Sequence, residues 1–424
     1  NRCRHDNNRV NRRERNSNGK MRTSNLNRLL RHTAPHRFLL LCLPFTASCS
    51  EGSGTEPCAG LPTRTVLVYL AGDNNLEEIG RTPELLRQGW KDTGSKCLIY
   101  YDAPQAAPKL FALTIRHSDA SSVLETVEEY PEENSSSAGV FGRVVADVVR
   151  KYPSDSYGLI FASHGSGWLP CGALSDPTRT IGDDRTPGTT GGAREMEITD
   201  FAAAIPDHQF DFIIFEACLM SGIEVAYELR NKTDYLLASS AELLVPGYAP
   251  VYPTAFQYLF DTSLGVPQAL EKFAGSYFNY IDTRNGAYRS ATQSIVYTRE
   301  MDALAILAGK TTGNTHGRWD DALLGKLQHF DRPGSYGDIP ARPRYFDFGQ
   351  YMAYLAPERQ ADLDALLRKT VVWKAATPEF MAGYNGFTIL THSGLTTYIE
   401  QDEFPELNAA YKKTAWWKAT HVQK

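Results

Sequence analysis

The stretch at residues 157–168, YGLIFASHGSGW, indicates the fold most directly. Its first seven residues, Tyr157–Ser163, form a continuous run of apolar and small side chains, which is typical of a short strand buried on both faces of a sheet. A second run of this kind, Phe210–Phe215 (FDFIIF), lies further along the chain. A side chain with reactive chemistry follows each run closely: His164 after the first and Cys218 after the second.

Similar apolar runs alternate with helical patterns on both sides of this stretch. Ala138–Lys151, for example, has apolar residues at three- and four-residue steps, as expected of an amphipathic helix. This alternation predicts an α/β fold with a mostly parallel central sheet and helices on both faces, in which ligands bind at the carboxyl ends of the strands. The other predicted strands are Thr65–Leu70, Cys97–Tyr101, Lys109–Ile115 and Tyr235–Ser239, and the other predicted helices are Glu77–Trp90 and Leu219–Arg230.

The chain beyond residue 300 has a more helical pattern. Two helices and a late strand pair are predicted there: Met301–Lys310, Pro357–Lys369, and the strands Gly386–Thr391 and Gly394–Glu400. We therefore divide the folded part into an α/β domain over residues 63–300 and a C-terminal region, rich in helices, over residues 301–424.

Composition excludes several classes of function. Of the 424 residues, 42% are hydrophobic, which is enough for a large core. The net charge of −5 gives no basic surface for nucleic acid, so no nucleic-acid partner is expected. The seven cysteines stand singly without a CxxC pair, and neither GxxxxGK[ST] nor HExxH occurs. The sequence therefore predicts no cofactor and no metal.

Residues 1–48 have the order of segments found in bacterial export signals. Residues 1–20 are polar and rich in Asn and Arg, and we interpret them as an upstream extension. After Met21 come several arginines and then the apolar run Phe38–Phe45, which is too short to span a membrane. This order predicts a secretory signal peptide.

Cys49 directly follows the small residues Thr46–Ser48, a pattern typical of a bacterial lipobox, in which the cysteine is lipidated. We therefore predict lipidation at Cys49, a flexible tether over residues 49–62, and an exported lipoprotein anchored in a membrane of the cell envelope. An ordinary signal peptide cleaved near Ser48 is the alternative.

His164 and Cys218 are the candidate catalytic residues. Each alone is more often structural, but two residues at matching ends of parallel strands are expected to lie close together. A thiol at the start of the predicted helix is favoured as thiolate, and a neighbouring imidazole exchanges its proton. The backbone N–H groups of Gly165 and Cys218 are the predicted oxyanion hole. Together they predict covalent catalysis by a cysteine.

Four stretches resemble the clostripain family of cysteine peptidases: TVLVYLAGDNNLEE (65–78), HGSGW (164–168), IGDD (181–184), and the segment from EACLMSG to SSAE (216–242). The resemblance covers most of Thr65–Tyr252, and the combined motifs are far longer than a chance match. It implies a caspase-like α/β/α sandwich, with residues 63–300 as the peptidase domain, and a His/Cys dyad at His164 and Cys218.

The resemblance also implies cleavage of peptides or proteins after Arg or Lys. Carboxylates are expected in the pocket that binds this basic P1 side chain. The family usually has Asp two residues before the cysteine, where this chain has Glu216. Glu242 is the second predicted acid of the pocket, and a solvated loop carboxylate is the alternative interpretation of Glu242.

The loop between His164 and Cys218 carries two further expectations from the resemblance. Family members are often activated by cleavage in this loop, and the predicted autoprocessing positions are Arg179, Arg185 and Arg194. Some relatives depend on calcium, and the loop residues with suitable oxygen ligands are Asp183, Asp184 and Glu195. Because acidic loop residues are usually just solvated, we predict no tight metal site.

Two other functions stay open at this point. One is a catalytically silent surface lipoprotein that keeps the fold and binds peptides or glycans, which the departure at Glu216 allows. The other is a different hydrolase or a transferase with a cysteine nucleophile, such as an amidase acting on cell-wall substrates. The presence of both His164 and Cys218 favours the peptidase over the silent relative.

Overall fold

The computed structural model describes residues 63–174, 181–185, 195–312, 321–335 and 340–421. They belong to one compact unit, Ala59–Lys424. Three residues with predicted roles, Cys49, Arg179 and Arg194, lie outside the described residues. Among the residues that the structure does describe, no helix combines the length and the apolar character needed to cross a membrane.

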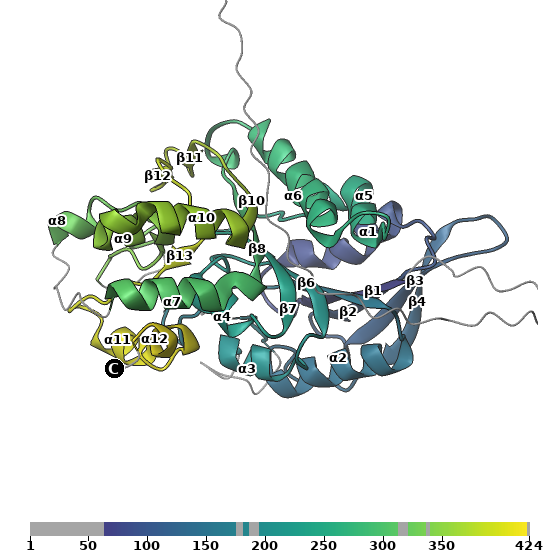
Figure 1. Cartoon of the computed structure of the whole chain (residues 1–424). Coiled ribbons are helices and arrows are strands. Elements are labelled where there is room, and N and C mark those ends of the chain that lie inside the picture. The colour runs from purple at the N-terminus through teal and green to yellow at the C-terminus, as the bar shows by residue number, and fades with distance from the viewer. Residues whose placement is uncertain (1–62, 175–180, 186–194, 313–320, 336–339, 422–424) are drawn as a thin grey trace, which may run out of the picture. The chain divides into compact units, whose positions relative to one another are not determined.

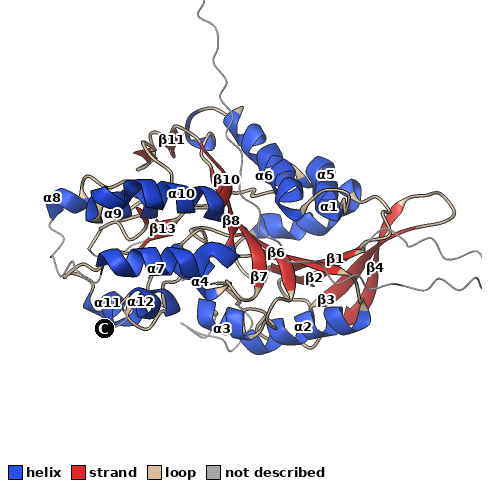
Figure 2. Ribbon diagram, viewed as in Figure 1, coloured by secondary structure: helices blue, strands red, loops and turns tan. Residues whose placement is uncertain are grey.

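A nine-stranded sheet forms the centre of this unit, in the order β10-β8-β7-β6-β5-β1-β2-β3-β4 (Figure 2). The middle strands β7, β6, β5, β1 and β2 pair in parallel, and the pairings toward both edges are antiparallel. The strands span Arg64–Ala71 (β1), Lys96–Asp102 (β2), Lys109–Ile115 (β3), Ser122–Glu129 (β4), Ser156–Ala162 (β5), Phe210–Glu216 (β6), Thr233–Ala238 (β7), Thr292–Tyr297 (β8) and Val371–Ala376 (β10). Among the described residues, four short strands lie outside this sheet: Phe346–Asp347 (β9), Glu379–Phe380 (β11), Phe387–Thr388 (β12) and Thr396–Thr397 (β13).

Helices cover both faces of the sheet, with α1, α5 and α6 on one face and α2, α3, α4 and α7 on the other (Figure 1). The predicted α/β/α sandwich with a mostly parallel sheet is therefore confirmed. The helices span Thr82–Gly89 (α1), Ala138–Lys151 (α2), Ile198–Ala203 (α3), Ile223–Glu228 (α4), Tyr252–Ala255 (α5), Val266–Asp282 (α6), Met301–Thr312 (α7), Asp321–Leu324 (α8), Phe348–Leu355 (α9), Gln360–Thr370 (α10), Pro405–Tyr411 (α11) and Ala415–Thr420 (α12).

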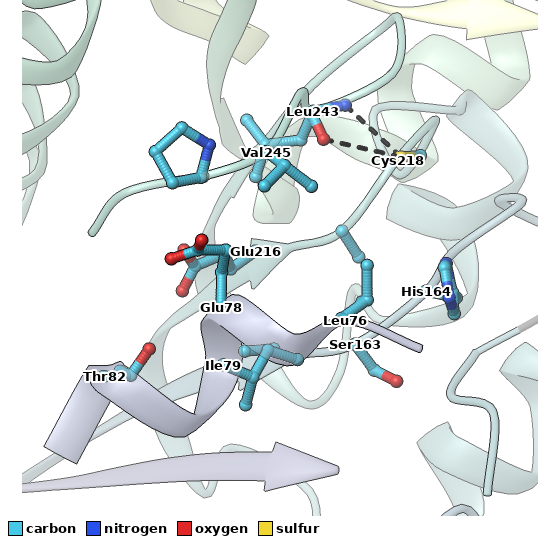
Figure 3. A pocket seen from close by; sticks show the side chains of 14 residues that line it. Leu76, Glu78, Ile79, Thr82, Ser163, His164, Glu216, Cys218, Leu243 and Val245 are labelled. Atoms are coloured by element: carbon cyan, nitrogen blue, oxygen red, sulfur yellow. Dashed lines mark hydrogen bonds between the residues drawn. The ribbon is translucent and has the colours of Figure 1, made fainter. Parts of the chain in front are cut away.

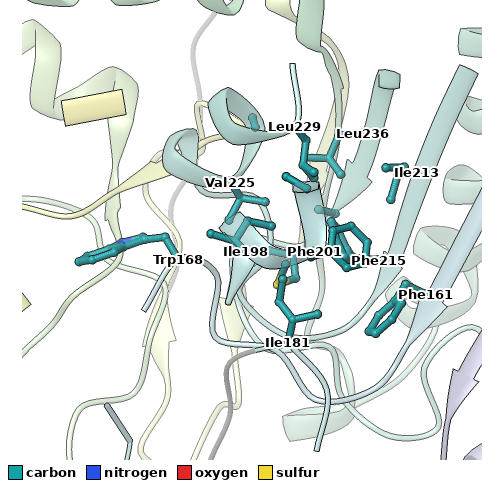
Figure 4. Packing of buried hydrophobic residues seen from close by; sticks show 14 of the residues in the cluster. Phe161, Trp168, Ile181, Ile198, Phe201, Ile213, Phe215, Val225, Leu229 and Leu236 are labelled. Carbon is teal, nitrogen blue, oxygen red and sulfur yellow. The ribbon is translucent and has the colours of Figure 1, made fainter. Parts of the chain in front are cut away.

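Burial on both faces explains why the central strands are continuously apolar. In β1, Leu67 and Tyr69 pack into one core cluster, whereas Val66 and Val68 pack into the other. Figure 4 shows the first cluster, in which Phe161 of β5 lies with the neighbouring aromatic and aliphatic side chains. Each such side chain contributes roughly 1.5–3 kcal/mol when fully buried, so this core holds the strand ends in place.

The C-terminal region completes the same sheet. β10 pairs antiparallel with β8, and described residues after position 300 pack into the same core as the residues before them. The predicted pairing of two late strands is wrong, because β12 pairs with β11 and β13 pairs with β9. An apolar pattern identifies a strand but not its partner, which packing and register select.

Candidate active site

The two strands that precede His164 and Cys218 are neighbours in the sheet. β5 and β6 pair in parallel, with Ala162 opposite Glu216. The pairing continues one residue further, since the Ser163 N–H donates to the carbonyl oxygen of Glu216 at 3.3 Å. His164 and Cys218 therefore each follow their paired strand residue by two positions.

Both side chains line one small cavity, which measures about 60 Å³ and is partly open to solvent (Figure 3). Four segments form it: the connection from β1 to α1, the ends of β5 and β6, and the loop after β7. The lining residues are Leu76, Glu78, Ile79, Thr82, Ala162, Ser163, His164, Glu216, Ala217, Cys218, Leu243, Val245, Pro246 and Gly247. The cavity thus lies at the carboxyl ends of adjacent parallel strands, as the sequence predicted.

Cys218 lies in a turn and not at the start of a helix, so that part of the prediction is wrong. Helix α4 begins only at Ile223. Leu219 has φ of 61°, a left-handed conformation that stops a helix from starting there. The Leu219 N–H donates to the Ala241 carbonyl oxygen at 2.9 Å instead. The thiol therefore lies five residues before the first residue of α4.

The half-buried Cys218 thiol contacts the loop after β7. The Leu243 N–H donates to Cys218 Sγ at 3.4 Å, and the thiol donates to the Leu243 carbonyl oxygen at 3.8 Å (Figure 3). A donor at this distance stabilises negative charge on sulfur. Both backbone groups of Leu243 therefore hydrogen-bond with the sulfur.

The His164 side chain is buried, with 5% of its surface exposed. Its ring Nε2 lies 2.7 Å from Oδ1 of Asn75. Its carbonyl oxygen accepts a hydrogen bond from Gly182 N at 3.1 Å. Both the ring and the backbone of His164 are therefore held by segments outside β5.

The surroundings of Gly165 leave no room for a side chain. A Cβ built at this position would lie 2.7 Å from the Cys218 carbonyl oxygen and 3.0 Å from Ala217 Cβ. The backbone after His164 therefore passes directly against the backbone at Cys218. This contact places the two groups of the predicted oxyanion hole on neighbouring turns.

Glu216 turns its carboxylate toward the cavity. It accepts hydrogen bonds from Tyr248 N at 2.7 Å and from the Tyr252 hydroxyl. Burial raises the pKa of Glu216 to about 7, although both hydrogen bonds oppose this shift. Gly247 has φ of 61° and would place a Cβ 2.4 Å from Glu216 Oε1, so a glycine is needed beside this carboxylate.

Glu242, the second predicted pocket acid, is not among the residues that line the cavity. Its carboxylate is buried and forms a two-point ion pair with Arg332, at 2.6 Å to Nε and 3.0 Å to Nη2. The alternative of a solvated loop carboxylate is therefore wrong, because Glu242 is buried and pairs with the cation of Arg332.

The acidic residues of the loop after β5 interact with protein groups. Asp183 pairs with Arg185 at 3.3 Å, Asp184 accepts bonds from Ser135, and Glu195 accepts one from Gly172 N at 3.5 Å. Within the described ranges, no three His, Cys, Asp or Glu side chains are grouped so that they could hold a metal ion. Arg185 is exposed, and its backbone N–H donates to the Asp73 carbonyl oxygen at 2.8 Å.

The C-terminal region supports both reactive turns. Trp168, four residues after the histidine, packs against Tyr398 and Tyr411, with ring centroids 5.1 and 5.2 Å away. Ser221, three residues after the cysteine, donates to the Gly394 carbonyl oxygen at 2.7 Å. The C-terminal region therefore contacts both turns of the candidate site.

A sequence profile of the clostripain family matches residues 68–307, more than half of the 424-residue chain. The chain belongs to the clostripain family. The resemblance noted in the sequence is thereby confirmed. Clostripain from Hathewaya histolytica is 26% identical over 290 residues, covering 61% of this chain and 52% of clostripain. The chain thus spans about half the length of this curated relative.

Solved structures of two further family members resemble the whole described fold. The inactive zymogen of a C11 protease from Parabacteroides distasonis is 29% identical, with a TM-score of 0.69, covering 85% of this chain and 98% of the zymogen. A secreted C11 cysteine protease from Bacteroides thetaiotaomicron is 25% identical, with a TM-score of 0.71, covering 85% of this chain and 99% of that protease. A secreted C11 cysteine protease from B. thetaiotaomicron in complex with an irreversible peptide inhibitor is 25% identical, with a TM-score of 0.70. The match covers 84% of this chain and 98% of that protease. The caspase-like peptidase fold is therefore shown for this clostripain-family chain.

Two residues that the structure brings to the candidate site, one beside His164 and one in the cavity lining, were not predicted from the sequence. Asn75 and Glu78 lie in the segment after β1 that carries a family motif, yet the motif alone assigned neither of them a role. β1 is the neighbour of β5, so residues after its carboxyl end approach His164. His164 and Cys218 were selected because they follow the carboxyl ends of parallel strands. Asn75 and Glu78 follow the carboxyl end of β1, so the same signal could have identified them.

Proposed function

We propose that this chain is a cysteine endopeptidase that cleaves after Arg or Lys, with His164 and Cys218 as its dyad. The single observation that carries the proposal is that both side chains, and the carboxylate of Glu216, line the same cavity. Membership of a peptidase family makes an amidase on other substrates the less economical interpretation.

The chemistry assigned to the dyad is acyl transfer. His164 takes the thiol proton as Cys218 sulfur attacks the carbonyl carbon of the scissile peptide bond. The N–H groups of Gly165 and Cys218 stabilise the resulting oxyanion. His164 then returns the proton to the leaving amine, which leaves a thioester on Cys218. Water hydrolyses this thioester and restores the thiol.

Two carboxylates support a basic P1 preference. Glu216 lies two residues before the nucleophile, and Glu78 lines the same cavity from the segment after β1. Glu78 forms an exposed ion pair with Arg81 at 3.2 Å, which is a weak interaction that a substrate cation can replace. A Lys or Arg side chain in the cavity stabilises the ionised form of Glu216, whereas burial alone disfavours it. We do not assign Glu242 to this pocket, because it is paired with Arg332.

The proposal includes export and anchoring. A lipidated Cys49 followed by a polar tether would hold the enzyme at a membrane of the cell envelope. One structural relative is described as a secreted protease, which supports export of this chain. Activation by cleavage at Arg185, or at Arg179 or Arg194 nearby, is consistent with a preference for basic residues.

A peptide library that varies only the P1 residue tests the proposal. We expect cleavage after Lys or Arg by the natural chain, loss of cleavage in Cys218→Ala and His164→Ala, and no loss in Cys171→Ala, which changes a thiol outside the cavity. Binding of peptides without cleavage by the natural chain would favour the silent relative. Cleavage unaffected by Cys218→Ala would overturn the assigned nucleophile.

A further inference from the structure

We propose that Asn75 is a positioning residue that sets the tautomer and orientation of the His164 ring. The inference rests on the dyad proposed above. It adds which ring nitrogen of His164 accepts the proton of the Cys218 thiol. Its basis is the 2.7 Å contact between Asn75 Oδ1 and His164 Nε2.

The tautomer follows from the chemistry of the amide oxygen. Oδ1 is an acceptor only, so Nε2 carries the hydrogen in this pair. In the neutral ring the other nitrogen, Nδ1, then has the lone pair that accepts the thiol proton. Rotation about the side-chain bonds of His164 would break the contact with Asn75, so the same bond also limits the ring orientation.

The segment that carries Asn75 is braced on both sides. Asn74 Nδ2 donates to the carbonyl oxygens of Ala71 at 2.7 Å and Asp183 at 3.0 Å. Asn74 Oδ1 accepts from Leu76 N at 2.8 Å. The Asn74 side chain therefore holds the backbone on either side of Asn75. The Asn75 side chain contacts the histidine.

The same neighbouring segment also holds His164. Gly182 N donates to the His164 carbonyl oxygen at 3.1 Å, and Arg185 N donates to the Asp73 carbonyl oxygen at 2.8 Å. Residues 181–185 thus contact His164 and the two residues that precede Asn75. This shared support keeps the distance between Asn75 and His164 short, although Asn75 itself is exposed.

A neutral orienting group suits this cavity. Cys218, Glu216 and Glu78 are the other titratable groups that line it beside His164. An amide oxygen fixes the ring through its dipole and adds no third negative charge. An aspartate at the same place would hold the ring but would also favour its doubly protonated form, which cannot act as a base.

The first measurement does not depend on activity. In the full chain labelled with ¹⁵N-histidine, the imidazole spectrum is assigned to His164 by comparison with His164→Gln. In the natural chain, we expect the neutral His164 ring to be protonated at Nε2. Asn75→Leu replaces the amide with a side chain of similar volume that has no acceptor. In this variant we expect a mixture of the two neutral tautomers. Asn75→Asp should move the pH of the second protonation upward by about one unit.

The second measurement separates positioning from binding. We expect Asn75→Leu to lower kcat by about 10- to 100-fold with KM changed less than about twofold, because a general base contributes roughly 10²–10⁴-fold in total. Asn75→Asp should recover activity at high pH, since it restores an acceptor. Matched substitutions at the exposed Asn279 of α6, Asn279→Leu and Asn279→Asp, should change neither readout.

The outcomes distinguish the two proposals. A neutral ring protonated at Nδ1 in the natural chain, or an unchanged tautomer and kcat in Asn75→Leu, would overturn the role of Asn75. Absence of cleavage by the natural chain would refute the proposed peptidase instead, and the spectrum would still decide whether Asn75 sets the tautomer.

Discussion

Ala162 of β5 lies directly opposite Glu216 of β6 in the parallel register. This one pairing determines the geometry of the whole site, because His164 and Cys218 each follow by two residues. A shift of one residue between these strands would turn every side chain of one strand to the opposite face, including the apolar residues that fill the two cores. The core therefore enforces the alignment on which the proposed chemistry depends.

Glu216→Gln tests the pocket carboxylate through its pH dependence. The pKa of Glu216 is raised to about 7, so in the natural chain its negative charge appears as the pH rises through this value. In a Cys218→Ala background, the affinity for an Arg-ended peptide should therefore rise between about pH 6 and 8. Glu216→Gln should remove that rise and weaken binding about tenfold at pH 8, as expected for loss of a charge-assisted bond.

The control for this experiment is Glu406→Gln, an exposed carboxylate on α11 that should leave binding unchanged. Titration calorimetry supplies both affinities. An identical pH dependence in Glu216→Gln would show that another group recognises the cation.

Glu242→Gln should affect stability and not specificity. Removing one partner of a buried ion pair leaves the other charge uncompensated, so Glu242→Gln should lower the free energy of unfolding by about 3–5 kcal/mol. Chemical denaturation measures this loss. In a double-mutant cycle of Glu242→Gln and Arg332→Gln, the effects on the free energy of unfolding should not add, and the difference gives the coupling energy of the pair. A changed P1 preference with unchanged stability would instead return Glu242 to the specificity pocket.

Gly165→Ala should lower activity strongly through a steric effect. The added Cβ would lie 2.7 Å from the Cys218 carbonyl oxygen, so the two turns must separate. We expect kcat/KM to fall at least about 100-fold, comparable to removal of an oxyanion donor. Gly139→Ala is the matched control: no atom lies within 4 Å of its Cβ, and alanine should stabilise α2 by about 0.5–1 kcal/mol.

Asp102→Asn should alter how stability depends on pH. Burial raises the pKa of Asp102 to about 8, and neighbouring Asp184 contributes in the same direction. The folded chain therefore holds a proton that the unfolded chain releases near pH 4, so this group's contribution to stability falls as the pH rises from about 4 to 8. Asp102→Asn should flatten this slope and stabilise the protein by about 1 kcal/mol or more at pH 8.

Thermal unfolding between pH 5 and 8 measures the effect of Asp102→Asn. Asp362→Asn, at an exposed position of α10, should leave the slope unchanged. If Asp102→Asn were less stable than the natural chain at pH 8, Asp102 would be ionised and its environment would stabilise the charge.

Local pattern identified the central strands because they are buried on both faces. β1, β5 and β6 appear at the predicted places, since a short continuous apolar run is typical of a strand covered by helices on both sides. The edge strand β4 was missed because its side chains are mostly exposed or half-buried and show no such run. The predicted helix from Leu219 was too long, because the left-handed backbone at Leu219 depends on a tertiary bond to Ala241.

What the sequence by itself determined was the sandwich, which follows from locally acting side-chain type and spacing, and the family, which its motifs resemble. It also selected His164 and Cys218 as the candidate dyad, because each follows a buried strand. Only the tertiary structure decided the partners of the charged and polar groups: Glu242 with Arg332, Glu216 with the loop after β7, and Asn75 with His164. The physical reason is that a hydrogen bond or ion pair acts over a few ångströms, between segments whose separation along the chain says nothing about their distance in space.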